Sequence, residues 1–165
     1  MLSRQHPFAL RDLALLRSMP DLKTFFNELV RFEVEMWDAV DARLRAEHGV
    51  PLGRFEPMRV IASTPNCRVY DIAHALSLTT GGTSKLVDQI EAAGHCRRRP
   101  NPDDRRSSII ELTAAGSRLV EKATKTVEDE LEQRIGSVLP DRSLHQLTAN
   151  LVKLRESGRE NAAAA

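Results

Sequence analysis

Residues 71–113 read DIAHALSLTTGGTSKLVDQIEAAGHCRRRPNPDDRRSSIIELT, and their apolar pattern changes from helical to extended along the way. The first part predicts a short helix over 69–76, a polar turn at 77–79 and a second helix from about Thr80 to Ala93. Two helices joined by a tight polar turn form a helix-turn-helix. The second helix of such a unit can enter the major groove of DNA, where short polar side chains and cations read base edges.

The rest of this stretch is extended. Its period-two pattern predicts strands over 96–99 and 109–112, joined by a turn at 100–105. Residues 97–106 hold five arginines and two aspartates, which is +3 in ten residues of a chain whose net charge is +1. A hairpin with this charge beside a helix-turn-helix can reach a minor groove, whose negative potential attracts arginine.

Helices are also predicted before this unit. An apolar stripe at helical spacing starts after Asp21, an N-cap candidate, and defines a long helix within 21–50. A second helix is expected over 53–62, with Pro57 tolerated if it lies in the first turn. Residues 1–20 are expected to form a short helix or a frayed arm.

Two further helices are predicted after the hairpin, over 113–135 and 141–156. The fold expected is mainly α with a small β-hairpin wing: a winged helix-turn-helix with long N- and C-terminal dimerisation helices. The expected parts are an N-terminal extension at 1–20, a helical dimerisation region at 21–50 and 114–156, a winged helix-turn-helix domain at 52–113, and a frayed tail at 157–165.

Composition supports a globular chain. Hydrophobic residues make up 41% and charged residues 28% of the 165 residues. No apolar run approaches the ~20 residues that cross a bilayer, and no signal-peptide pattern opens the sequence. We therefore expect a soluble, cytoplasmic protein with no membrane partner.

Four segments together resemble the MarR family of winged-helix transcription regulators: DIAHAL at 71–76, TSKLVDQIEAAG at 83–94, DDRR at 103–106 and LTAAG at 112–116. The resemblance implies a homodimer whose terminal helices interlock and whose two lobes grip a pseudo-palindromic operator in double-stranded DNA. It also implies a repressor that a small phenolic or carboxylate ligand releases. Some members of the family are instead thiol sensors.

Candidate site residues follow from the helix-turn-helix and the hairpin. The residues expected to read or anchor in the major groove are Thr79, Thr80, Thr83, Ser84, Lys85 and Gln89. On the hairpin, Arg105 and Arg106 are expected in the minor groove, with Asp104 holding an arginine in place. Arg98 is expected to touch a phosphate. The pair Gly81-Gly82 is compatible either with close approach to the DNA backbone or with a loosely wound first turn.

Candidates for a small aromatic or anionic effector are Trp37 and Arg59, set against the simpler interpretations of a core tryptophan and a surface arginine. The five histidines lack metal-ligand spacing, so no metal or other cofactor is expected.

Other classes of function remain as alternatives. The sequence lacks the common nucleotide-binding, hydrolase and metalloprotease motifs, which argues against an enzyme. A winged-helix protein that binds another protein without DNA is one alternative. A redox-sensing regulator that uses Cys67 or Cys96 is the other, although a structural role for these cysteines is favoured.

Overall fold

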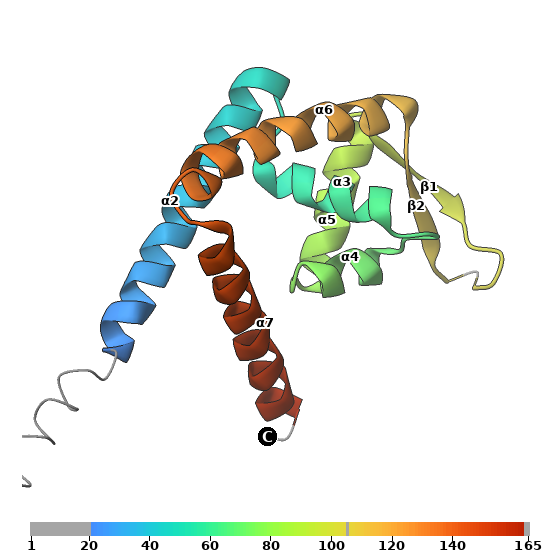
Figure 1. Ribbon diagram of the computed structural model, residues 1–165. Helices are drawn as coiled ribbons and strands as arrows, with labels where there is room; N and C mark the ends of the chain where they lie inside the picture. The colour runs from blue at the N-terminus through green and yellow to red at the C-terminus, as the bar shows by residue number, and fades with distance from the viewer. Residues whose placement is uncertain (1–20, 105, 164–165) are drawn as a thin grey trace, which may run out of the picture. The chain divides into compact units, whose positions relative to one another are not determined.

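The computed structural model describes residues 21–104 and 106–163, with side chains to residue 158 in the last helix (Figure 1). The predictions for residues 1–20 and Arg105 lie outside the described residues, as do the last two residues of the predicted tail. The chain divides into two compact units, one ending at Asp38 and one beginning at Ala39.

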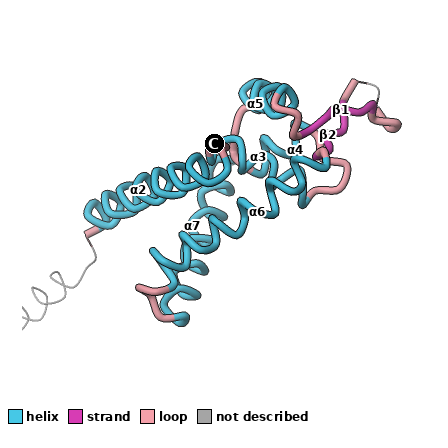
Figure 2. The backbone as a smooth tube through the Cα atoms, turned by 90° about the horizontal axis from the view of Figure 1, so that it is seen from above, coloured by secondary structure: helices cyan, strands magenta, loops and turns pink. Residues whose placement is uncertain are grey.

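The fold is mainly helical with one antiparallel hairpin, which confirms the predicted fold class (Figure 2). The elements are α2 (Leu22–His48), α3 (Leu52–Ser63), α4 (Val69–Ala75), α5 (Thr80–Ala92), β1 (Cys96–Pro100), β2 (Ser108–Leu112), α6 (Ala114–Leu131), a short π-helical segment η1 (Glu132–Gly136), and α7 (Asp141–Ala163).

Helix α3 lies at the centre of the second unit and packs against α4, α5, α6 and β2. Its Phe55 and Met58 are buried completely, together with Ile72 of α4 and Val87 of α5. Burial of an aliphatic or aromatic side chain contributes ~1.5–3 kcal/mol relative to exposure. This core therefore fixes the helix-turn-helix on α3 and the hairpin.

The hairpin has a defined register and a second attachment. Arg98 pairs with Ile110 at its middle, and Ile110 is almost fully buried. The backbone N–H of Ile110 also donates to the carbonyl of Cys67 over 2.7 Å. The hairpin is thus held by the segment that precedes α4, which no periodicity in the sequence indicates.

Pro57 corrects one prediction, because it lies in the second turn of α3 rather than the first. A proline there cannot donate a hydrogen bond to the carbonyl of Gly53, which normally weakens a helix. Pro57 is fully buried in the core, and its packing offsets part of that loss.

The C-terminal helices also differ from the prediction. Thr113 caps α6, but regular α-helix ends at Leu131 and continues as the π-helical η1 to Gly136, within the helix predicted over 113–135. Helix α7 extends to Ala163, so most of the predicted frayed tail is helical.

A polar network joins the end of α2 to α6. Glu130 is nearly buried and pairs with Arg43 over 3.1 Å and with Arg134. The guanidinium groups of Arg134 and Arg43 lower the pKa of the Glu130 carboxyl. The charged form of Glu130 therefore stabilises the folded protein.

We expect Glu130→Gln to lower the thermal midpoint at pH 7. Because the folded-state pKa is depressed, the stabilisation is present above the unfolded-state pKa of about 4.3 and is lost as the pH falls through the folded-state value. The difference in midpoint, followed by circular dichroism, should therefore shrink between pH 7 and pH 3. Glu128→Gln, at an exposed position of the same helix, is the control. A midpoint difference that does not depend on pH would contradict this role.

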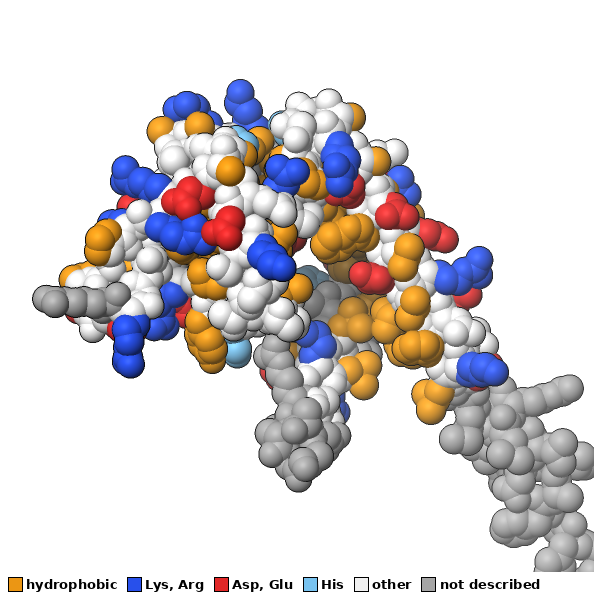
Figure 3. All heavy atoms as spheres, turned by 180° about the vertical axis from the view of Figure 1, so that it is seen from behind, with side chains coloured by type: hydrophobic (Ala, Val, Ile, Leu, Met, Phe, Trp, Pro, Cys, Tyr) orange, Lys and Arg blue, Asp and Glu red, His pale blue; other side chains and the backbone are white. Residues whose placement is uncertain are grey.

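Apolar side chains remain exposed on the terminal helices, as Figure 3 shows along α2. Those of α2 are Leu22, Phe25, Phe26, Val30, Phe32, Val34 and Trp37, and those of α7 are Leu147, Val152 and Leu154. Helices that expose this much apolar surface are typical of an interaction site.

Candidate nucleic-acid interface

Helix α5 and its N-cap present most of the predicted groove-reading residues. Thr79 is its N-cap, and its Oγ1 accepts a hydrogen bond from the backbone N–H of Gly82 over 3.2 Å. Thr80, Lys85 and Gln89 are exposed along the same helix. The cap fixes where α5 begins, so these side chains project from defined positions on the protein surface.

Thr83 does not belong to this surface, so its assignment to DNA contact is wrong. It is fully buried, and its hydroxyl donates to the carbonyl of Thr79 over 3.0 Å. Ser84 is half-buried, which leaves its hydroxyl partly accessible. Thr83 thus stabilises the first turn instead of reading a base.

The two glycines of this turn have different surroundings. A Cβ at Gly82 would lie 3.1 Å from Thr79 Oγ1, tight against the capping group. A Cβ at Gly81 would meet nothing within 4 Å. Packing against Thr79 therefore explains a glycine at position 82. At position 81 no neighbour in the protein requires a glycine, so close approach of the backbone to DNA stays a proposal for Gly81.

The hairpin loop presents Arg106. Its side chain is 95% exposed and contacts Asp104 at 3.5 Å through Nε, while its backbone N–H donates to the same carboxylate at 3.0 Å. The hydrogen bond from this backbone N–H is the largest cause that lowers the pKa of Asp104. Asn101 closes the loop by donating to Ser107 over 2.9 Å. Asp104 thus lies where the sequence predicted, against an arginine of the wing.

The arginines of β1 are paired within the protein. Arg97 and Arg99 both bond to Glu111 of β2. Arg98 bonds to Asp88 and Glu91 of α5. Two carboxylates therefore compensate the charge of Arg98 in this structure, which argues against the predicted phosphate contact.

Lys85 differs from these arginines. It is exposed and makes no ion pair with any residue that the structure describes. In Figure 1 the start of α5, helix α4 and the hairpin loop lie toward the same edge of the second unit. This edge carries the positive charges of Lys85 and Arg106, and positive side chains are what neutralise the phosphates of DNA.

The two candidate effector contacts lie on different helices. Trp37 is 45% exposed on α2. Arg59 is exposed on α3 and pairs with Glu56 over 2.7 Å, which raises the pKa of Arg59. Ligand contact by either residue stays a prediction.

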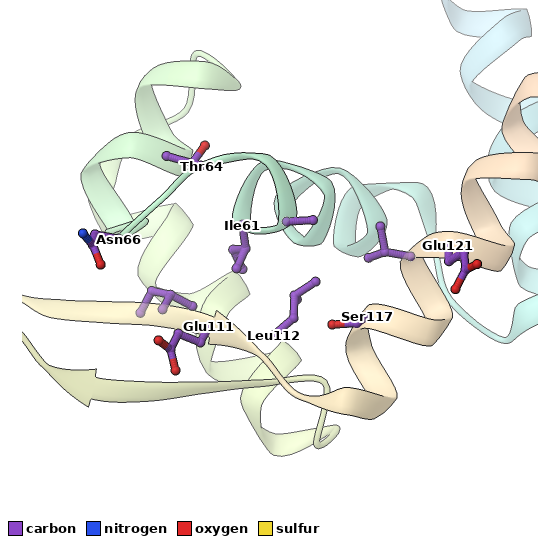
Figure 4. Close-up of a pocket in the computed structure, with 10 residues that line it drawn as sticks. Ile61, Thr64, Asn66, Glu111, Leu112, Ser117 and Glu121 are labelled. Carbon is purple, nitrogen blue, oxygen red and sulfur yellow. The ribbon is translucent and has the colours of Figure 1, made fainter.

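A cavity of about 410 Å³ lies between α3, β2 and α6 (Figure 4). Its lining residues are Ile61, Ala62, Thr64, Asn66, Ile110, Glu111, Leu112, Ser117, Val120 and Glu121. The volume falls within the range of small-molecule sites. The lining combines aliphatic groups with hydroxyls and two carboxylates, so it suits a neutral ligand better than an anion.

Both cysteines are buried. Burial is the main cause that raises the pKa of each thiol, Cys67 and Cys96, to about 11. Only the thiolate reacts readily with oxidants, and sensing thiols are exposed and have lowered pKa values. This environment disfavours the redox-sensor alternative.

In the segments 21–104 and 106–163, no three His, Cys, Asp or Glu side chains gather as metal ligands. Over the same segments, no helix has the length and hydropathy needed to span a membrane.

Sequence reasoning missed several residues near this surface. Asp88 and Glu91 were not identified, although two carboxylates three positions apart before an arginine cluster are a usable signal. Tyr70 and His74 stack on the surface of α4, with ring centroids 6.1 Å apart. A helical spacing of four residues between two aromatic rings indicates such a pair.

Comparisons with known proteins agree with this geometry. The family model described as MarR family matches residues 51–108, from the residue before α3 to the first residue of β2. The multiple antibiotic resistance protein MarR of Escherichia coli strain K12 is 25% identical over 123 residues, which are 71% of this chain and 85% of that protein.

Solved structures give the same assignment of the fold. AbsC, a MarR family transcriptional regulator from Streptomyces coelicolor, superimposes with a TM-score of 0.79 at 18% identity and covers 86% of this chain and 97% of its own. The S. aureus MepR–DNA complex gives a TM-score of 0.72 at 28% identity, with 80% of this chain and 97% of the other covered.

Proposed function

We propose that this chain, whose residues 51–108 match the family model described as MarR family, is a transcriptional regulator that binds specific sequences in double-stranded DNA. Helix α5 enters the major groove with Thr79, Thr80, Ser84, Lys85 and Gln89. The hairpin loop places Arg106, held by Asp104, in the minor groove; Arg105 of this loop keeps the same proposed role.

One observation carries this proposal. Lys85 is an exposed cation without an ion pair among the described residues, on a helix whose first turn is capped by Thr79 and braced by Thr83. A rigid helix end with hydroxyls and one available cation suits contact with base edges and phosphates. A purely protein-binding surface gives no reason for this combination.

The regulator acts, in this proposal, as a homodimer on a pseudo-palindromic operator. The support is the exposed apolar surface of α2 and α7. Two copies of a helix-turn-helix reach half-sites about one helical turn apart, so a two-fold protein matches a two-fold operator. Light scattering should accordingly give twice the mass of one chain.

We further propose that the protein is a repressor released by a small ligand. The support is the family resemblance together with the cavity between α3, β2 and α6. A ligand there would contact β2 of the wing and the start of α6. Because its lining lacks a cationic side chain, a phenolic ligand fits this cavity better than a carboxylate.

Fluorescence anisotropy over a salt series tests the DNA-binding function. The two probes are DNA from upstream of the protein's own gene and a scrambled duplex of the same composition. We expect the upstream fragment to bind ~10³-fold more tightly or better, with a steep negative dependence on salt. Equal, weak binding of both duplexes would place the operator elsewhere. No binding at low salt would favour the protein-interaction alternative.

A further inference from the structure

Arg98, Asp88 and Glu91 form a cluster, here named the wing clamp, that joins β1 to α5. The guanidinium of Arg98 donates to Asp88 Oδ1 over 2.6 Å and to Glu91 Oε2. The backbone N–H of Arg98 also donates to Glu91 Oε1 over 2.8 Å. Glu91 therefore holds both the main chain and the side chain of one residue of the hairpin.

The clamp acts at the middle of the hairpin. Arg98 is paired with Ile110, whose backbone N–H donates to the carbonyl of Cys67 over 2.7 Å. The hairpin is thus attached to α5 through β1 and to the segment before α4 through β2. A tilt of the hairpin relative to the helix-turn-helix must break one of these attachments.

On α5, the clamp lies beside the proposed DNA contacts. Asp88 follows Lys85 by three positions and Ser84 by four, so these side chains are neighbours on the helix surface. Arg106 lies in the loop of the hairpin, and its hydrogen bonds to Asp104 are within that loop. The position of Arg106 relative to Lys85 therefore depends on how the hairpin is fixed to α5.

We propose that the wing clamp sets the position of the hairpin on α5, so that Arg106 and Lys85 reach the same DNA duplex together. Arg98 is then a positioning residue and not a phosphate contact. Charge-assisted hydrogen bonds suit this role because they are shorter and stronger than neutral ones. The Arg98 side chain is 26% exposed and that of Glu91 is 37% exposed, so this pair is partly shielded from water, whereas Asp88 is 62% exposed. The inference rests on the DNA-binding function proposed above.

The double variant Asp88→Asn/Glu91→Gln separates positioning from simple electrostatics. It removes two negative charges per chain beside the DNA contacts, so attraction to phosphate alone predicts tighter binding. Loss of the clamp predicts the opposite sign, with the Kd for the operator rising at least about five-fold, which corresponds to about 1 kcal/mol. Anisotropy with the upstream fragment measures this. An unchanged or lower Kd would overturn the proposal.

A second test combines Arg98→Gln with Arg106→Ala. In the wild-type background, Arg106→Ala should reduce the salt slope of a dimer by about 1.8, or about 0.9 for each lost phosphate contact. In the Arg98→Gln background the same substitution should change the slope by less than half as much, because the loop is already displaced. If the effects of the two substitutions on the salt slope are instead fully additive, Arg98 contacts DNA independently of Arg106, and the proposal is overturned.

Circular dichroism of each variant checks that it is folded. If the double variant is not folded, Glu91→Gln is measured instead, since its side-chain oxygen can still accept the backbone N–H of Arg98; the expected direction is the same. Wild-type protein that shows no salt-dependent binding to any duplex would overturn the DNA-binding function and the clamp with it. Wild-type binding combined with tighter binding by the variants would overturn the clamp alone.

Discussion

Gly116→Ala is expected to destabilise the fold by about 3 kcal/mol, near the upper end of the usual cost of overpacking. Gly116 is buried in the first turn of α6, and a Cβ built there would overlap the backbone carbonyl of His95. That carbonyl accepts a hydrogen bond from the N–H of Thr113 over 3.0 Å, so it cannot move aside freely. Urea unfolding followed by circular dichroism measures the loss.

Gly81→Ala is the matched control for this substitution. Gly81 is exposed in the first turn of a helix and has nothing within 4 Å of its missing Cβ. Replacing a helical glycine by alanine should therefore raise the free energy of unfolding by up to about 1 kcal/mol. Equal effects of the two substitutions would contradict the close approach of α6 to His95. If Gly81→Ala also weakens operator binding, the glycine serves close approach to DNA.

Lys85→Ala is expected to weaken operator binding by at least roughly 100-fold. Hydrogen bonds to charged groups contribute about 1.5–3 kcal/mol each, and a homodimer loses one at each half-site. The salt slope should fall by about 1.8, because two phosphate contacts disappear, if the lysine binds phosphate. If it instead reads a guanine, discrimination at that base pair should relax by about 1–3 kcal/mol for each half-site. Anisotropy on the operator and on single-base variants distinguishes these roles.

Lys122→Ala provides the control for charge. Lys122 is exposed on α6, outside the proposed interface, and its removal changes the net charge of the chain equally. We expect a change in Kd below about two-fold, since exposed charges beyond a Debye length are screened. A loss similar to that of Lys85→Ala would show that overall charge, and not α5, governs binding.

The sequence alone determined the order of the described helices and strands and the type of each, apart from the π-helical η1. Helical and period-two spacing of apolar residues is a local property, so it located α4, α5, β1 and β2 to within one or two residues. The N-cap Asp21 was also readable, because a cap bonds to residues only two or three positions away, here to the backbone N–H of Lys23. The boundary of α7 was missed, since propensity decides helix ends only weakly.

The tertiary structure decided which of the polar residues are available. Thr83 and Arg98 have the residue types that DNA contacts require. However, Thr83 is fully buried, and Arg98 is paired with two carboxylates of α5. Which face of α5 turns inward, and which acid meets which arginine, depends on packing between segments distant along the chain. Residue type and local spacing therefore fix the chemistry that is present, whereas the packed fold fixes which of those groups faces a partner.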